Sequence, residues 1–268
     1  MKFAAYQASR IGGRKYNQDR VAYAYSDKAL LLVLADGMGG HQHGEIAAQI
    51  AIDVFMQAFA QAALPRIQKP EAFLRESMRH AHQAIIQYAY AQQLDGNPGT
   101  TCVAALVQDG QACWAHAGDS RCYLLRGGKI AAVTHDHSAV QQWADWGLIK
   151  PEEMKTHPDR NKITNCLGGV EGMFHVESTP AAPLQQGDVV LLCSDGLWGP
   201  LVDTDIELAF PAASSVAALE QLMGKALLLG GARADNTTAV VARWSDAEDD
   251  QPAPSPVCVA LEVEQPIS

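Results

Sequence analysis

The chain has 268 residues, of which 48% are apolar and 19% charged, and its net charge is −10. This length suits one large domain or two small ones with a substantial core, and the composition is that of an ordinary globular protein. The acidity disfavours a nucleic-acid partner, because that affinity depends largely on Lys and Arg. Apolar runs such as 29–35 are far shorter than the roughly 18 residues that a membrane helix requires. We therefore expect a soluble, cytoplasmic protein that binds neither membrane nor nucleic acid.

The six cysteines contain no C-x-x-C pair, and most of them lie inside apolar runs. This distribution favours buried free thiols over disulfides or a zinc site. The apolar stretch after Lys2 is too short for a signal peptide. Both observations indicate a reducing compartment.

Short β-rich runs bounded by Gly, Asp or Asn predict strands along most of the chain. The dipeptides at 109–110 and 127–128 are Asp-Gly and Gly-Gly, which favour tight hairpin turns and therefore antiparallel pairing. The predicted strands are 3–9, 20–26, 30–35, 100–108, 111–117, 122–125, 130–134, 174–179, 189–194 and 237–244.

Two long segments, 43–62 and 71–93, have the apolar spacing of amphipathic helices. In the first, the predicted apolar face carries Ile46, Ile50, Val54 and Phe55. Shorter helices are predicted at 138–146 and 214–229. The order of strands, a helix pair, more strands, helices and a last strand predicts an α+β domain whose helices cover a two-sheet core.

Two segments differ from this pattern. Residues 147–168 are polar and irregular, which is typical of a flap or loop. From 246 onward the chain reads DAEDDQPAPSP, an acidic Pro-containing tail. Its end, 257–264, alternates apolar and polar residues, which fits either an edge strand or docking segment, or a disordered end.

Four aspartates follow or precede apolar strand runs, and two of them begin Asp-Gly steps. They are Asp36, Asp119, Asp195 and Asp235. A single Asp after a strand is usually a turn former or a helix cap. Four acids at the ends of core strands instead suggest an assembled site at the rim of a rigid sheet.

Carboxylates suit Mg²⁺ and Mn²⁺, which are hard cations that prefer oxygen ligands. Two such ions about 4 Å apart can share a carboxylate and a hydroxide, lower the pKa of the bridging water and neutralise a phosphoryl group. The chain contains no H-E-x-x-H zinc motif, no phosphate-binding G-x-x-x-x-G-K-[ST] loop, no C-x5-R nucleophile and no G-x-S-x-G motif. The sequence therefore favours an oxygen-ligand divalent site.

Seven motifs lie in order along the chain: GGRKYNQDR at 12–20, LADGMGGH at 34–41, GTT at 99–101, AHAGDSR at 115–121, THDHS at 134–138, LLCSDGLW at 191–198 and DNTTAVV at 235–241. Together they resemble the protein phosphatase 2C (PPM) family, and specifically its compact bacterial serine/threonine phosphatase branch. The resemblance covers residues 1 to about 245 and implies a catalytic domain over 1–245 followed by a tail at 246–268. It also implies a central β-sandwich of two antiparallel sheets with helices on both outer faces.

The resemblance also implies a set of metal ligands. Asp36 would bridge two divalent metals, Mn²⁺ or Mg²⁺, with the Gly37 carbonyl on the second. Asp195 and Asp235 would hold the first metal. Asp119 would help to hold a third, weaker metal near the flap.

Further roles follow from the same resemblance. Asp19 would lie behind the metal-bound waters, and Arg14 would clamp the substrate phosphate with its paired N–H donors. His41 is a candidate acid for the leaving oxygen; the alternative is a histidine at a helix start that only touches solvent or substrate. Gln18 departs from the Glu that the family often has, which would weaken the second metal.

The implied activity is metal-dependent hydrolysis of phosphoserine and phosphothreonine by a metal-bridged hydroxide, with no covalent intermediate. Phosphorylated proteins would be the partners, including a cognate serine/threonine kinase or its substrates, and the enzyme would act as a monomer in signalling. Two alternatives remain at this point. A pseudophosphatase binding module would lack metal ligands, and none is missing here; a metallohydrolase of small phosphorylated molecules requires an activity panel to separate it.

Overall fold

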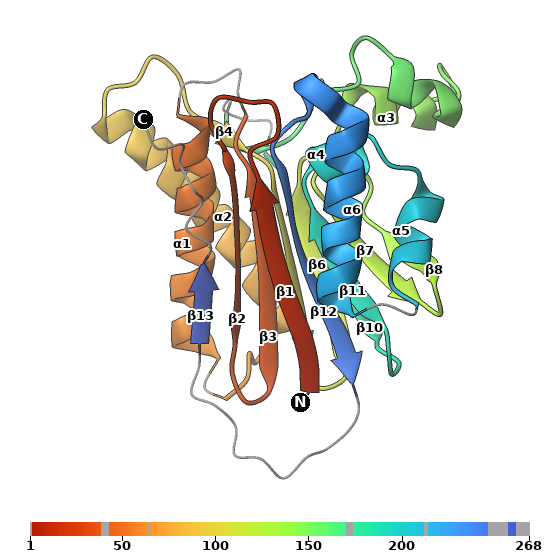
Figure 1. Cartoon of the computed structure of the whole chain (residues 1–268). Coiled ribbons are helices and arrows are strands. Elements are labelled where there is room, and N and C mark those ends of the chain that lie inside the picture. Colours follow the sequence, from red (N-terminus) through yellow and green to blue (C-terminus); the bar gives the residue numbers. More distant parts are fainter. Residues whose placement is uncertain are drawn as a thin grey trace.

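The structure, a computed structural model, describes residues 2–38, 43–63, 65–169, 174–211, 214–245 and 257–260, with only the backbone at Lys2 and at 257–260. Two antiparallel sheets pack face to face, and helices cover the outer face of each (Figure 1). This is the predicted α+β sandwich. None of the helices in the described part of the chain combines the length and hydropathy that crossing a bilayer requires.

The first sheet has five strands in the order β1-β12-β11-β7-β8. Sequence neighbours β7 and β8 form the hairpin predicted around Gly127-Gly128, whereas β1 pairs along its whole length with β12 near the other end of the chain. The strands are β1 (Lys2–Arg10), β7 (Arg121–Arg126), β8 (Lys129–Val133), β11 (Val189–Cys193) and β12 (Thr237–Ser245).

The second sheet has six strands in the order β10-β6-β5-β3-β2-β13. A further short pair joins β4 to β9 beside it. The bounds are β2 (Asp19–Tyr25), β3 (Ala29–Asp36), β4 (Gly99–Thr100), β5 (Cys102–Gln108), β6 (Gln111–Ala117), β9 (Leu167–Gly168), β10 (Glu177–Pro183) and β13 (Val257–Ala260).

Strand β3 shows why these runs are uninterruptedly apolar. Leu30, Leu32 and Leu34 belong to the core between the two sheets, while Leu31 and Val33 belong to the core under the helices. Side chains alternate across a strand, so a strand covered on both faces has no solvent side on which to place polar residues. The same alternation in β11 places Val190 and Leu192 between the sheets.

Two helices, α1 (Gly44–Ala62) and α2 (Pro70–Ala91), cover the second sheet; α4 (Asp195–Trp198), α5 (Asp203–Ala209) and α6 (Ser215–Gly230) cover the first (Figure 1). The predicted apolar face of α1 was rotated from the true one. Phe55 is buried, but Ile46, Ile50 and Val54 are only partly buried, and the rest of the inner face consists mainly of alanines together with Ile52 and Phe59. Small side chains allow the helix backbone to approach the sheet closely.

The segment predicted as a flap contains short structured pieces. Helix α3 (Ala139–Asp145) is followed by the 3₁₀ turn η1 (Pro151–Thr156), and the chain then returns to form a bridge between Ser138 and Ile163. Trp146, which follows α3, is 68% exposed. A second 3₁₀ turn, η2 (Gly231–Arg233), precedes Asp235.

Several predicted elements differ from the structure in extent, and others were not predicted. The strand expected at 174–179 begins only at Glu177 and continues to Pro183. The short helices α4 and α5 were not predicted because they are too brief to show an apolar period. In the tail, Val257–Ala260 pairs antiparallel with the edge strand β2, which agrees with the edge-strand alternative; 261–264 lie outside the described residues.

The cysteine prediction is confirmed for the residues whose side chains the structure describes. Cys102, Cys113, Cys122 and Cys193 are buried free thiols, and Cys166 is half-buried and also free. Burial raises the pKa of Cys166 to about 11, which keeps the thiol protonated and unreactive at neutral pH.

Truncating Phe55 tests how much the contact between α1 and the sheet stabilises the fold. Phe55 is fully buried, so Phe55→Ala should lower the free energy of unfolding by about 3–5 kcal/mol in urea titrations. Tyr90→Ala is the matched control, because Tyr90 is 87% exposed and its loss should change stability by less than about 0.5 kcal/mol. Equal effects of the two substitutions would contradict this packing.

Candidate active site

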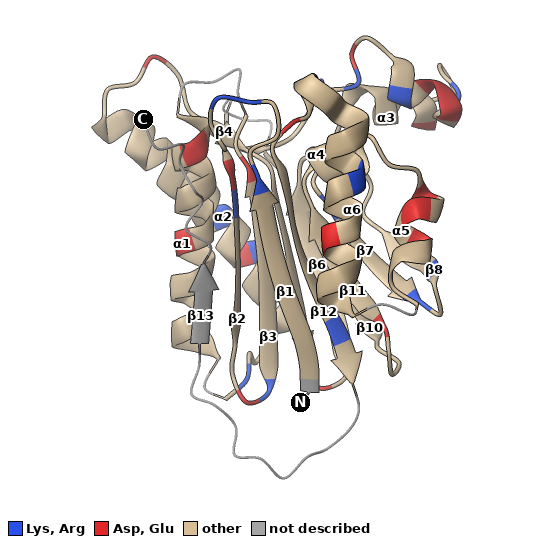
Figure 2. Ribbon diagram, viewed as in Figure 1, with Lys and Arg blue, Asp and Glu red and all other residues tan. Residues whose placement is uncertain are grey.

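A cavity of about 670 Å³ opens at one edge of the sandwich, where strands of both sheets end. The acidic ends of β2 and β3 and the basic turn that follows β1 lie at this edge (Figure 2). The described residues that line the cavity are Gly13, Arg14, Lys15, Tyr16, Gln18, Asp36, Gly37, Met38, Thr101, Asp119, Asn161, Ile163, Asp195, Asp235 and Asn236. Six of the residues that were predicted to bind metal or phosphate therefore line one cavity, and Gln18 lines it as well.

Asp36 is the last residue of β3, and Thr101 of the neighbouring chain segment holds its backbone on both sides. The Asp36 N–H donates to Thr101 Oγ1 at 3.2 Å, and the Thr101 N–H donates to the Asp36 carbonyl at 2.9 Å. Gly37 follows in a space that no larger residue fits: a Cβ there would lie 2.4 Å from the Gly44 carbonyl oxygen. Only glycine fits in this close backbone packing, and Gly37 also lines the cavity.

Asp195 and Asp235 come from adjacent strands of the first sheet. Asp195 begins α4 directly after β11, and Asp235 lies just before β12. Gly196 packs against the Asn236 carbonyl oxygen so tightly that a Cβ would lie 2.0 Å from it, which brings the two turns together. The family motifs contained both aspartates, and strand order places them side by side.

Asn236 is a site residue to which the sequence analysis gave no role. Its Nδ2 donates to the carbonyls of Ile11 at 2.8 Å and Tyr16 at 3.0 Å, and its Oδ1 accepts from the Gln18 N–H at 2.9 Å. It therefore fixes the loop that carries Arg14 to the turn that carries Asp235. The motif DNTTAVV contained this residue, but its contacts are long-range and leave no periodic signal.

Asp19 lies behind the cavity and does not line it. Its side chain is fully buried, and it stands directly opposite Asp36 in the pairing of β2 with β3. The Ser194 hydroxyl donates to Asp19 Oδ2 at 2.9 Å, while Oδ1 has no hydrogen-bond partner among the described residues. A buried carboxylate oxygen without a partner is costly, so this atom is suited to a water or cation in the cavity.

Burial and mutual repulsion raise the pKa values of the carboxyls here. The pKa of Asp195 is raised to about 7, first by burial and then by the charges of Asp235 and Asp19; the pKa of Asp19 is raised to about 6, mainly by burial. The pKa values of Asp36 and Asp119 are raised well above their usual range, again with burial as the largest cause. Such a cluster favours cations strongly, because a divalent ion removes the repulsion.

Asp119 follows β6, and its surroundings hold it firmly. Trp198 donates its indole N–H to the Asp119 carbonyl at 2.9 Å, and the Arg121 guanidinium lies 3.6 Å above the Trp198 ring. Arg121 itself makes two hydrogen bonds with Asp136, at 2.8 and 2.7 Å. The Asp119 side chain is buried at the cavity wall, in contrast to an ordinary turn aspartate.

Arg14 lies in the cavity, where its guanidinium pairs with Asp235 Oδ2. Its side chain remains 55% exposed, so further N–H donors are accessible to a ligand. Gly13 anchors the loop: its N–H donates to the Ala234 carbonyl at 2.8 Å, and a Cβ would lie 2.3 Å from the Ala232 carbonyl oxygen. His41 lies outside the described residues, so its predicted role stays a prediction.

Comparison with known proteins gives this arrangement its family. The family model described as Protein phosphatase 2C matches residues 6–227. A serine/threonine phosphatase, stp, of Listeria monocytogenes is 34% identical over 206 residues, which is 76% of this chain and 81% of that protein. The serine/threonine protein phosphatase PstP of Mycobacterium tuberculosis is 39% identical over 249 residues, which is 90% of this chain and 45% of that protein.

A solved structure of the PstP catalytic domain in complex with two manganese ions superposes with a TM-score of 0.75. It is 34% identical and covers 91% of this chain and 99% of that one. The chain therefore belongs to the protein phosphatase 2C family. It is an enzyme of the protein phosphatase class, as the ordered motifs had indicated.

Replacing Asp195 tests the electrostatic state of the site. Between the ordinary pKa of 3.8 and the raised pKa of about 7, the folded metal-free protein binds more protons at Asp195 than the unfolded chain does, so this group lowers stability as pH rises. Metal-free Asp195→Asn should therefore be more stable than wild type in urea at pH 7.5, with a smaller difference at pH 5. Mn²⁺ should reverse the order at pH 7.5, and a variant less stable than wild type without metal at both pH values would contradict the argument.

Proposed function

We propose that this protein phosphatase hydrolyses phosphoserine and phosphothreonine in proteins with the help of two divalent cations, Mn²⁺ or Mg²⁺. The observation that carries the proposal is the convergence of four carboxylates and one arginine on a single cavity, with Asp19 directly behind it. These side chains suit both the cations and the substrate, because carboxylates attract divalent cations and the guanidinium attracts the phosphate.

The residues present fit two metal ions. The donor set is all oxygen, which suits Mn²⁺ and Mg²⁺, and the unpartnered Asp19 Oδ1 supports the fit independently. We assign Asp36 to both ions, the Gly37 carbonyl to the second, and Asp195 and Asp235 to the first. Asp119 would serve a third, weaker ion at the cavity wall.

When bound, the two cations lower the pKa of a water and neutralise charge on the phosphoryl group. Arg14 would orient the phosphate with the donors that its bond to Asp235 leaves accessible, and would stabilise the charge that develops on the phosphoryl oxygens. Among the described residues that line the cavity there is no cysteine, serine or histidine. The Thr101 hydroxyl is already bonded to the Asp36 N–H and to Ser120, and the aspartates would hold the cations, which favours direct attack by water without a covalent enzyme intermediate.

A second cavity of about 630 Å³ adjoins the first and shares Arg14, Asp119, Asn161, Asp195 and Asp235 with it. The two spaces together are large enough for an extended segment around a phosphorylated residue, which favours protein substrates over small phosphorylated molecules. A serine/threonine kinase of the same cell, or its substrates, is the natural class of partner. The enzyme would act as a monomer, with residues 1–245 as the catalytic domain and 246–268 as a tail.

Substitutions at Asp36 and Arg14 test this function on phosphothreonine peptides with Mn²⁺, with chelator as the negative control. Asp36→Asn should lower kcat by roughly 100-fold or more, since even outer-shell partners of a metal affect its binding on that scale. Arg14→Gln should lower kcat/KM by roughly 10- to 100-fold through the loss of charge-assisted bonds. Arg66→Gln is the matched control, because Arg66 pairs with Asp109 on the surface. Chelator-resistant wild-type activity would refute the proposal.

Gln18 offers a separate test of the second metal. Its amide donates to Glu45 Oε2 at 3.2 Å and lines the cavity. Gln18→Glu should lower the Mn²⁺ concentration for half-maximal activity, because it adds a carboxylate whose repulsion from Glu45 a cation relieves. Glu45→Gln in the same background should reduce the gain. An unchanged Mn²⁺ dependence in Gln18→Glu would show that this position does not contribute to metal binding.

A further inference from the structure

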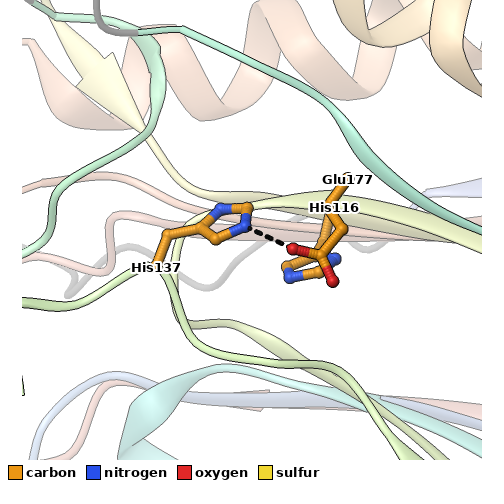
Figure 3. A group of neighbouring side chains, drawn as sticks. All are labelled: His116, His137 and Glu177. Carbon is orange, nitrogen blue, oxygen red and sulfur yellow. Dashed lines mark hydrogen bonds and ion pairs between the residues drawn. The ribbon is translucent and has the colours of Figure 1, made fainter. Parts of the chain in front are cut away.

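Three side chains outside the cavity form a cluster of possible metal ligands: His116 on β6, His137 in the loop after β8, and Glu177 at the start of β10 (Figure 3). Each has a ligand atom within 4.8 Å of the others. His116 and Glu177 stand opposite each other in the pairing of β6 with β10, and the two imidazole rings stack at 4.5 Å. His116 and His137 are only 2% and 6% exposed.

The protonation of His137 argues against a metal here. Its Nδ1 accepts the Gly118 backbone N–H at 3.1 Å, and a backbone N–H can only donate. Asn165 Nδ2 donates to the same atom at 2.8 Å. The Asn165 amide cannot be reversed without loss, because it donates to the His175 carbonyl and accepts from the His175 N–H.

With Nδ1 occupied, the proton of the neutral ring lies on Nε2, which donates to Glu177 Oε2 at 3.1 Å. His137 therefore presents an N–H, and not a lone pair, to the centre of the cluster. His116 donates its Nε2–H to the His135 carbonyl at 2.8 Å and keeps a free Nδ1. Only His116 and Glu177 could then bind an ion, which is too few protein ligands for a structural site.

The same hydrogen bonds indicate that His137 holds the neighbouring backbone in place. Its own backbone N–H donates to the Gly118 carbonyl at 3.0 Å. Gly118 therefore makes two hydrogen bonds with His137, one to the backbone and one to the ring. Gly118 immediately precedes Asp119 and has φ +115°, and a Cβ there would lie 2.6 Å from Thr101 Cβ. The turn that carries Asp119 is thus held against both Thr101 and His137.

His137 also holds the returning strand of the flap. Its carbonyl accepts the Thr164 N–H at 2.8 Å, and its ring accepts from Asn165. The next residues continue the pairing, since Ala139 donates to the Lys162 carbonyl at 2.8 Å. One histidine therefore joins the flap segment 162–165 to the turn of Asp119. Burial lowers the pKa of His137 to about 4, so its ring stays neutral at neutral pH.

We propose that His137 is a positioning residue that holds the Gly118–Asp119 turn and the flap segment 162–165 as one unit, through the acceptor Nδ1. Its test by Mn²⁺ binding rests on the proposed function, in which Asp119 holds the weakest ion. Its test by amide hydrogen exchange does not. The bond to Glu177 orients the ring and is secondary.

Two isosteric variants separate the roles of the ring nitrogens. In His137→Asn, the amide oxygen can take the place of Nδ1 and keep the bond from Gly118, whereas His137→Gln can keep only a donor to Glu177. In the metal-free proteins, amide hydrogen exchange at Gly118 and Thr164 should stay slow in His137→Asn and become faster in His137→Gln. Glu177→Gln, which keeps an acceptor for Nε2–H, is the matched control and should behave like wild type.

Calorimetric Mn²⁺ titration forms the second arm. His137→Gln should weaken the weakest Mn²⁺ binding step by roughly 10- to 100-fold, the scale seen for residues that support metal ligands, while His137→Asn retains it. Wild-type exchange and Mn²⁺ affinity in His137→Gln, or equal losses in both variants, would overturn the proposal. If wild type binds no Mn²⁺, the proposed function fails while the exchange result still stands.

If His137→Asn or His137→Gln does not fold, Asn165→Ala still tests how His137 is joined to the flap segment 162–165. That substitution removes the side-chain link between His137 and His175 but leaves the Gly118 bonds in place. Exchange should become faster at the His175 amide and remain slow at Gly118. Unchanged exchange at His175, or loss of protection at Gly118, would contradict the division of roles described here.

Discussion

The structure depends on holding several carboxylates together at the end of a β-sandwich. Asp19 and Asp36 come from the second sheet, and Asp195 and Asp235 from turns of the first. Burial and mutual repulsion both oppose this assembly, as the raised pKa values of Asp36 and Asp195 indicate. The apolar core between the sheets compensates for it, and the result is a cavity with a strong preference for cations.

Neutral polar residues make that arrangement rigid. Ser194 follows a strand of the first sheet and bonds to Asp19 in the second, so one hydroxyl links the two sheets behind the cavity. Thr101 holds the backbone of Asp36 and also bonds to Ser120, next to Asp119. Asn236 fixes the Arg14 loop. Preorganised charge of this kind is what phosphoryl transfer requires, since little reorganisation is left for the reaction itself.

The extents of the strands that are buried on both faces were predictable, because such burial leaves an uninterrupted apolar run. Strand β6 agrees with the predicted 111–117, and β3 extends the predicted 30–35 by one residue at each end. The orientation of α1 was not predictable from hydropathy, because its inner face is built largely from alanines and its larger residues Ile50 and Val54 lie at the edge of the contact.

The sequence by itself determined which carboxylates stand at the ends of strands and, through seven ordered motifs, the family and its sandwich. Strand ends are local features, and each is marked by the apolar run beside it. Only the tertiary structure decided that Arg14 pairs with Asp235, 221 positions away, that Gln18 meets Glu45, and that Gly118 sets the tautomer of His137. Those facts depend on donors and acceptors that are distant in sequence, and hydrogen-bond geometry exists only once the chain has folded.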